Sequence, residues 1–316
     1  MGITGFIYDP FYLEHLGWRF HPERPDRLNS VVEHMKESSL WDKLLHFSPI
    51  PADIKWIETV HTPTYIQTVK NAFQQGRTQL DPDTGICESS YDVALLAAGA
   101  GIVGVDAVMN EEVEHVFCAV RPPGHHAERD RAMGFCLFNN IAIAARYAQI
   151  HYHLERILIL DWDAHHGNGT QHAFEEDSSV FYISLHQWPF YPGTGSSVER
   201  GIGAGKGYTM NIPLPPGTGD REYLQCFTDE VIPAIDQFHP ELILISAGFD
   251  THADDPLAML DVSTDGFAQI SRLVADAAYR HCLGKIVSVL EGGYNLNALS
   301  ESVMQHLHVL CESNME

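Results

Sequence analysis

The chain has 316 residues, of which 45% are hydrophobic, and glycine and proline are spread along its whole length. This composition excludes a disordered or fibrous protein. A globular chain of this length buries about three quarters of the surface that its unfolded form exposes. We therefore expect a substantial core in a single domain of residues 1–316.

The net charge is strongly negative, because 42 Asp and Glu outnumber 19 Lys and Arg to give a formal value of −23. Such a field repels phosphate backbones, so we expect no direct nucleic-acid binding. The negative field attracts cationic ligands such as a Lys-rich peptide or a polyamine. A role of the charge in solubility alone explains the composition equally well.

The cysteines and the N-terminal residues predict a cytoplasmic protein without membrane association. The N-terminal MGITGFIYDP lacks the basic and apolar regions of a secretion signal, and Phe6 spoils a myristoylation signal. We see no long apolar span. No CxxC spacing occurs, and a chain of this size needs no disulfides, so we expect reduced thiols at Cys87, Cys118, Cys136, Cys226, Cys282 and Cys311.

Stretches typical of β-strands alternate with stretches typical of helices, which predicts parallel βαβ units. In chain order the predicted strands are residues 3–8, 115–120, 156–161, 180–185, 208–212, 241–246 and 285–291. Several are continuously apolar, as strands covered on both faces are. The predicted helices are residues 90–109, 139–152, 220–238 and 264–282.

Two local signals refine these helices. Thr264 is a candidate N-cap of the last helix. Pro233 should kink or split the helix at 220–238, because proline cannot donate to the helical hydrogen-bond ladder. Residues 21–40 resemble a loop that enters a helix, whereas residues 51–69 show no clear pattern.

Polar clusters follow five of the predicted strands: RPPGHH, DWDAHHGNG, SLHQ, SAGFD and EGGY. The carboxyl ends of parallel strands face one common edge of a sheet, where ligands bind. Residues that are distant in sequence can meet at that edge. The pattern therefore predicts an active site there.

Within DWDAHHG, Asp161, Asp163 and His165 are spaced two apart, so an extended backbone points them to one face. Crowded carboxylates raise each other's pKa unless a cation neutralises them, which favours a metal site over a buried hydrogen-bond network or helix cap. A lone Asp250 is usually a turn residue, but its place after a strand favours a ligand role. An Asp–His–Asp set leaves zinc an open coordination position, as catalytic sites do.

Three further side chains suit amide hydrolysis. His125 and His126 are adjacent, and two imidazoles with different partners can divide the work of base and acid, although such a pair is often only surface or packing histidine. Tyr294 follows two glycines that permit an unusual turn, so its phenol can donate to a developing oxyanion. The alternative is a core tyrosine with a satisfied hydroxyl.

The motifs RPPGHHAERDRAMGFCLFNN, DWDAHHGNGTQHAF, FYPGTG, SAGFDTHADDPLAML and LEGGYN resemble the zinc-dependent histone deacetylase and acetylpolyamine amidohydrolase superfamily. The likeness runs from HPERPDRL to LEGGYN and is closest to class II and bacterial members. It implies an arginase-like three-layer α/β fold, with a central, mostly parallel sheet and helices on both faces. It also implies hydrolysis of acyl-lysine to acetate and free lysine.

The resemblance assigns roles to residues of this chain. Zn²⁺, or Fe²⁺ depending on availability, would be held by Asp163, His165 and Asp250. The catalytic group would comprise His126 as base and then acid, His125 as its electrostatic partner, Tyr294 on the carbonyl, Asp161 orienting His125, and Asn168 contacting His126 where some members carry Asp. The acyl-lysine tunnel would involve Gly134, Phe135, Tyr191 and Leu257.

Potassium is also implied by the resemblance. The first ion would contact the Asp161 carboxylate, the Ser184 hydroxyl and the carbonyls of Asp163, His165 and Leu185. A second, peripheral ion would involve Phe174, Asp177, Val180 and Tyr208.

Three alternatives remain open. Acetylpolyamine deacetylation is favoured by the acidic charge and by loop residues expected to rim the mouth, namely Asp81, Asp83, Asp254 and Asp255, whereas the apolar Leu257 disfavours it. An arginase-like dimanganese ureohydrolase would need ligands for a second metal, and SAGFD supplies only Asp250. An acyl-lysine-binding pseudoenzyme is disfavoured because every expected catalytic position is filled.

Overall fold

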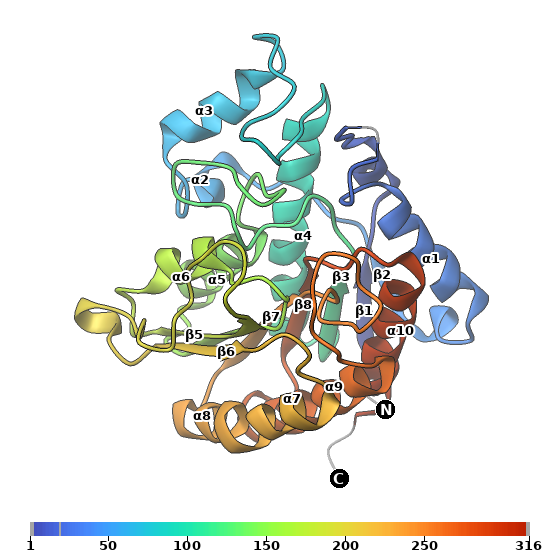
Figure 1. Ribbon diagram of the computed structural model, residues 1–316, viewed down its shortest axis with the longest axis vertical. Coiled ribbons are helices and arrows are strands. Elements are labelled where there is room, and N and C mark those ends of the chain that lie inside the picture. Colours follow the sequence, from blue (N-terminus) through green and yellow to red (C-terminus); the bar gives the residue numbers. More distant parts are fainter. Residues whose placement is uncertain (1–2, 19, 314–316) are drawn as a thin grey trace.

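The computed structural model describes residues 3–18 and 20–313, so both ends of the predicted 1–316 domain lie outside the described residues. Within them, eight strands form one sheet in the order β2-β1-β3-β8-β7-β4-β5-β6 (Figure 1). All pairings between neighbouring strands of this sheet are parallel, which confirms the predicted sheet. The strands are β1 (Thr4–Ile7), β2 (Leu45–Phe47), β3 (His115–Cys118), β4 (Ile157–Asp161), β5 (Val180–Gln187), β6 (Thr209–Leu214), β7 (Leu242–Ala247) and β8 (Ile286–Leu290).

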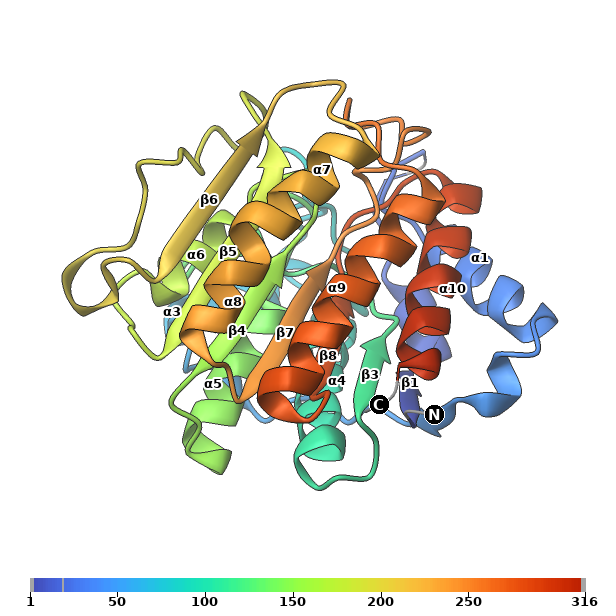
Figure 2. The ribbon, with the colours of Figure 1, turned by 90° about the horizontal axis from the view of Figure 1, so that it is seen from below.

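Helices cover both faces of the sheet, as predicted for a three-layer fold. Figure 2 shows one face behind α7 (Asp220–Cys226), α8 (Ile232–Phe238), α9 (Thr264–Cys282) and α10 (Leu296–Glu312). The opposite face carries α4 (Ser90–Met109), α5 (Asn140–Tyr152) and α6 (Asn168–Phe174). The remaining helices are α1 (Asp26–Glu37), which packs on α10, α2 (Ile54–Ile57) and α3 (Pro63–Ala72). The central strands are covered on both sides, which explains their continuously apolar sequences.

Five elements of the described residues escaped prediction: strand β2 and helices α2, α3, α6 and α10. Strand β2 has only three residues, and Leu45 and His46 are exposed at the sheet edge, so it lacks the apolar signal of the central strands. Helix α10 was not predicted either, although its buried residues recur on the face that packs against α1 and α9. The seven strands that were predicted all occur, with ends that differ by at most two residues.

The two local signals fared differently. Helix α9 begins at Thr264, but its N-cap is Ser263, whose backbone is extended and whose hydroxyl accepts a hydrogen bond from Gly266 N at 3.1 Å. The N-cap prediction was therefore wrong by one residue. In the segment 220–238, a π-helical turn at Phe227–Val231 separates α7 from α8. Pro233 lies in the first turn of α8, where its missing N–H is tolerated, so the predicted split occurs.

Helix α4 contradicts the expectation that the chain has no long apolar span. By length and composition alone its 20 residues are apolar enough to cross a bilayer. Most of the helix is buried, and it packs against α5 and β3. A helix that is covered on nearly every side carries apolar residues all round, which accounts for its composition.

Candidate active site

Loops that follow different strands meet at the carboxyl edge of the sheet. The loop after β3 reaches β4, because His125 Nδ1 lies 3.0 Å from Asp161 Oδ2. The loop after β4 reaches the one after β7, where Ala164 N donates to Asp250 Oδ1 at 2.7 Å. The loop after β8 closes the group through Gly292 N, which donates to Asp163 Oδ2 at 2.8 Å. The predicted convergence of the strand ends is present.

Asp163, His165 and Asp250 form a compact cluster in which one ligand atom of each lies within 4.8 Å of the others. His165 Nδ1 lies 3.1 Å from Asp163 Oδ1 and 3.0 Å from Asp250 Oδ2. Each carboxylate accepts a backbone hydrogen bond at its other oxygen, from Gly292 N or Ala164 N. These bonds aim the remaining oxygens at the imidazole, so the three donors face a common point.

This donor set fits a divalent cation. Burial and the neighbouring Asp163 raise the pKa of Asp250 to about 7. Burial acts to lower the pKa of His165, but its hydrogen bonds to the two carboxylates raise it to about 10. Two buried carboxylates thus demand a positive charge, which a divalent cation supplies. With three protein ligands, such an ion keeps a position open for a substrate oxygen.

The adjacent His125 and His126 are both buried, and their ring centroids lie 4.0 Å apart. His126 Nδ1 lies 2.8 Å from Asn168 Oδ1, which is the contact expected for this pair. Burial and the charges of His125 and His165 hold the pKa of His126 well below its usual value. Burial acts in the same direction on His125, but Asp161, Asp163 and Glu291 raise its pKa well above the usual value. The surroundings of the two side chains therefore favour the charged form of His125 and the neutral form of His126.

Asp161 lies behind His125 and outside the cluster of three. Its carboxylate also accepts hydrogen bonds from the Tyr182 hydroxyl at 3.0 Å and from Asp163 N at 3.2 Å. Ser184, its register partner on β5, makes a hydrogen bond to His186 at 2.9 Å. Leu185 is buried beside them. The first potassium site stays a prediction.

The residues of the second potassium site come from α6, the loop after it, the start of β5 and the residue that precedes β6. The Asp177 carboxylate is paired with Arg146, and the Arg146 guanidinium lies 4.4 Å from the centroid of the Phe174 ring. Tyr208 accepts a backbone hydrogen bond from Tyr182. Arg146 already neutralises the Asp177 carboxylate, so this carboxylate does not require an ion. The second potassium site also stays a prediction.

The turn that carries Tyr294 depends on glycine, as predicted. Gly293 has φ +120°, and Gly292 packs so closely on the carboxylates of Asp163 and Asp250 that a Cβ would not fit. Tyr294 N donates to Asp255 Oδ2 at 2.7 Å, and the Arg27 guanidinium lies 4.9 Å from the centroid of the Tyr294 ring. The Tyr294 side chain is thereby held beside the cluster.

Aromatic rings pack against His126, His165 and Tyr294. Tyr191 packs edge-on against His126 with centroids 5.2 Å apart, and Phe135 packs edge-on against Tyr294 at 6.0 Å. Phe190, which the sequence analysis did not single out, stacks on His165 at 5.1 Å. Gly134 has φ +57° and lies against the His126 ring, where a Cβ would collide. These positions suit the walls of a narrow tunnel.

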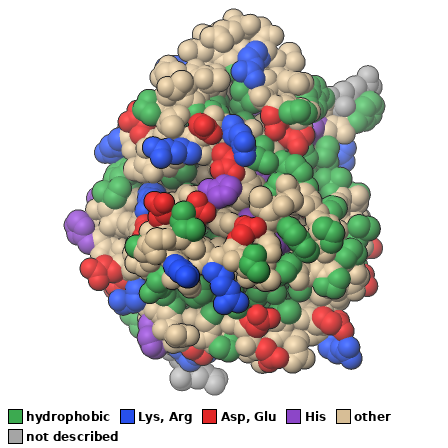
Figure 3. Space-filling view, turned by 60° about the vertical axis from the view of Figure 1, so that its left-hand side comes forward, with side chains coloured by type: hydrophobic (Ala, Val, Ile, Leu, Met, Phe, Trp, Pro, Cys, Tyr) green, Lys and Arg blue, Asp and Glu red, His purple; other side chains and the backbone are tan. Residues whose placement is uncertain are grey.

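Of the acids expected at the rim, Asp255 is buried and ties two loop nitrogens, those of Leu257 and Tyr294, so its expected place on an open rim is wrong. Asp254 is exposed. Asp83 accepts a hydrogen bond from Gly134 N at 3.1 Å, and Asp81 caps the turn that carries Asp83. On the face shown in Figure 3, acidic side chains are interspersed with Lys and Arg.

A buried ionic network that the sequence analysis missed supports the site. Arg121 forms a two-pronged ion pair with Glu23, and Arg27 donates to the carbonyls of Glu291 and Gly293. The Glu291 carboxylate accepts from Gly124 N at 2.6 Å and His125 N at 3.1 Å. The charged residues of this network lie in the motifs HPERPDR, RPPGHH and EGGY. A charged side chain is almost never buried without a partner, so ion pairs between these motifs could have been predicted.

Residues 21–310 match the family model described as the histone deacetylase domain. The chain is 42% identical over 296 residues to a probable deacetylase of Archaeoglobus fulgidus. The aligned region covers 93% of this chain and 82% of that protein. The chain is also 38% identical over 301 residues to the human polyamine deacetylase HDAC10. That aligned region covers 91% of this chain and 44% of that protein.

A crystal structure of the HDA15 HD domain superposes with a TM-score of 0.93 at 37% identity, covering 98% of this chain and 88% of that one. The expected arginase-like fold is therefore confirmed. Together with the family match, these similarities show that the chain belongs to the histone deacetylase family of hydrolases.

Proposed function

We propose that this enzyme is a zinc-dependent deacylase of acyl-lysine in proteins or peptides, releasing acetate and the free amine. The observation that carries the proposal is the meeting of a buried Asp–His–Asp cluster with two differently partnered imidazoles and a tyrosine on a glycine turn. Zn²⁺ or Fe²⁺ held by Asp163, His165 and Asp250 would supply Lewis acidity toward the amide carbonyl.

The remaining chemistry falls to side chains of the chain. His126 takes a proton from the attacking water at Nε2 and returns it to the amine as the C–N bond breaks. Tyr294 donates a hydrogen bond to the carbonyl oxygen as negative charge develops there. His125, held cationic by Asp161, stabilises that charge. Phe135 and Tyr191 line the approach of the lysine chain, and Gly134 accepts its amide N–H.

The test is a substrate panel with metal content measured on the same preparation. We expect release of acetate from acetyl-lysine peptides, with about one zinc per chain as three converging ligands imply. A protein that contains zinc but releases no acyl group from any peptide or polyamine would contradict the proposal. Two manganese ions per chain would instead favour the ureohydrolase alternative.

Acetylpolyamine deacetylation is the second candidate, supported by the similarity to a polyamine deacetylase and by the net charge of −23. Leu257, partly buried next to Asp255, offers no charge to bind an amine and supports the peptide substrate. Comparing kcat/KM for an acetyl-lysine peptide and N-acetylputrescine decides between the two.

We also propose structural K⁺ ions at the two sites named above and a cytoplasmic location. The six free cysteines support a reducing compartment. Exchange of K⁺ for Na⁺ during activity assays and fractionation of the source cells test these two proposals.

A further inference from the structure

We propose that Glu128 is a positioning residue for His126 and acts through the side-chain amide of Asn168. The inference rests on the proposed function in that it takes His126 as the base. Asn168 Nδ2 donates to Glu128 Oε1 at 2.5 Å, and Asn168 Oδ1 lies 2.8 Å from His126 Nδ1. Glu128 is 7% exposed, so little water competes for these contacts.

The chemistry of the acceptors fixes which way the amide points. Asn168 Nδ2 faces two oxygens, the Glu128 carboxylate and the His126 carbonyl at 3.3 Å. An ionised carboxylate and a carbonyl only accept, so the NH₂ group must lie on that side. Asn168 Oδ1 is left toward His126, and because it too only accepts, His126 must carry its proton on Nδ1. The lone pair of Nε2 is then free to act as the base.

Glu128 is itself held from three directions. His172, one turn after Asn168 on α6, places Nδ1 at 2.9 Å from Glu128 Oε1 and 3.0 Å from Oε2. Arg131 approaches Glu128 Oε1 at 3.7 Å. The backbone carbonyl of Glu128 accepts from the buried His61 at 2.8 Å. The carboxylate therefore clamps the loop after His126 onto the first turn of α6.

Without the Glu128 carboxylate the amide of Asn168 loses its stronger acceptor and can rotate by half a turn. Its NH₂ group would then face His126 Nδ1 and favour the tautomer with the proton on Nε2. That tautomer cannot accept a proton from water at the reacting edge. The consequence is a lower kcat at an unchanged KM, because substrate binding does not involve Glu128.

The experiment compares Glu128→Ala with two related variants in the full-length, metal-loaded enzyme acting on an acetyl-lysine peptide. We expect Glu128→Ala to lower kcat about tenfold with KM within about twofold, which is less than the loss of an acid–base group because His126 itself remains. Adding Asn168→Asp to this variant should restore kcat at least about fivefold, since either oxygen of Asp accepts from Nδ1. Glu128→Gln, whose amide oxygen still accepts, should stay within about threefold of the parent.

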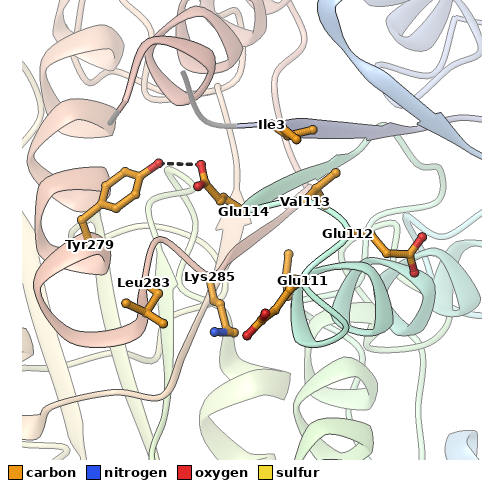
Figure 4. A pocket seen from close by; sticks show the side chains of 9 residues that line it. Ile3, Glu111, Glu112, Val113, Glu114, Tyr279, Leu283 and Lys285 are labelled. Atoms are coloured by element: carbon orange, nitrogen blue, oxygen red, sulfur yellow. Dashed lines mark hydrogen bonds between the residues drawn. The ribbon is translucent and has the colours of Figure 1, made fainter. Parts of the chain in front are cut away.

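The matched control is Glu114→Ala. Glu114 directly precedes β3, so it lies at the amino ends of the strands, opposite the active site. Figure 4 shows the Glu114 carboxylate turned toward the Tyr279 hydroxyl, which donates to it at 2.9 Å. This variant also removes a partly buried carboxylate with a side-chain partner and should leave kcat unchanged. Should Glu128→Ala not fold, Glu128→Met replaces it, because methionine has similar length but no oxygen.

Each result decides the inference. Normal kcat in Glu128→Ala or Glu128→Met, or a loss in Glu128→Ala that Asn168→Asp does not repair, overturns the inference and leaves Glu128 with a purely structural role. The proposed function has its own criterion in His126→Ala, measured alongside. An inactive His126→Ala beside a fully active Glu128→Ala rejects only this inference, whereas an active His126→Ala rejects the proposed base and with it the premise.

Discussion

His125 and His126 are neighbours in the chain, yet the structure gives them opposite partners. The Nδ1 atom of His125 meets the carboxylate of Asp161 directly, whereas that of His126 meets the amide of Asn168. The carboxylates around His125 raise its pKa against the effect of burial, while burial and two imidazoles lower that of His126. The surroundings thus shift the pKa values of two identical side chains in opposite directions, which suits one to stabilise charge and the other to move protons.

Removal of the metal should have the largest effect on turnover and on both imidazoles. His125 lies beside the ligand Asp163, and His126 lies beside the ligand His165. We expect a chelator to abolish turnover and to lower the melting temperature, since two buried carboxylates lose their counter-charge. Added Zn²⁺ should restore both. Melting curves and acetate release measure the outcome, and full turnover by demonstrably metal-free protein would contradict the proposed cation.

Replacing each histidine separates their roles. His126→Ala should lower kcat at least about a hundredfold, the usual size of a lost acid–base group. His125→Ala should cost about tenfold, because only electrostatic stabilisation is lost while proton transfer continues. Steady-state kinetics on both variants, with folding checked by circular dichroism, test the division. Equal losses would show that the two imidazoles share one task.

Tyr294→Phe removes the hydrogen bond to the developing oxyanion without changing the turn. We expect kcat to fall about a hundredfold with little change in KM, because the bond forms chiefly in the transition state. The Arg27 contact with the ring is retained in this variant, so its melting temperature should match the parent. Near-normal turnover by the purified variant would remove Tyr294 from the mechanism.

Asp161→Asn makes the partner of His125 resemble that of His126. The neutral amide should let the pKa of His125 fall and reduce kcat about tenfold, while His126 keeps its own partner. The pH dependence of kcat measures the effect. If kcat and its pH dependence are unchanged, the charge on His125 has no part in turnover.

The buried ionic network of Glu23, Arg121 and Arg27 should affect the free energy of unfolding more than it affects the difference in pKa between His125 and His126. Burial acts to raise the pKa of Glu23, but its bonds to Arg121 lower it from 4.5 to about 2. A lowered folded-state pKa contributes stability above the unfolded value, and this is lost as the pH falls from about 4.5 to 2. We expect the loss to reach about 3 kcal/mol in urea unfolding.

A matched variant isolates that contribution. Glu23→Gln cannot titrate, so its free energy of unfolding should be lower at neutral pH and should depend less on pH across the same window. Parallel pH profiles for the two proteins would exclude Glu23 as the cause of the acid sensitivity.

Much of this molecule follows from the sequence. Continuously apolar segments predicted seven strands, and the helices at 90–109 and 264–282 have the predicted ends. The polar clusters after the strands indicated an active edge, and alternation along the chain placed Asp163 and His165 on one face. These features are local, because side-chain spacing along a strand or helix fixes the direction in which neighbours point.

The sequence alone could not supply the contacts between segments. Strand β2 forms because β1 offers an edge, and Ser263 displaces Thr264 as N-cap because Asp220 accepts from Ser263 N at 2.7 Å and fixes its backbone. Asp250 reaches His165 across 85 positions of the chain, and Arg27 reaches Gly293 across 266. Glu128 contacts the site through Asn168 and His172, which the packing of α6 places beside it. Such partnerships depend on which segments the fold packs together, and that is decided by the burial of the whole core rather than by any local pattern.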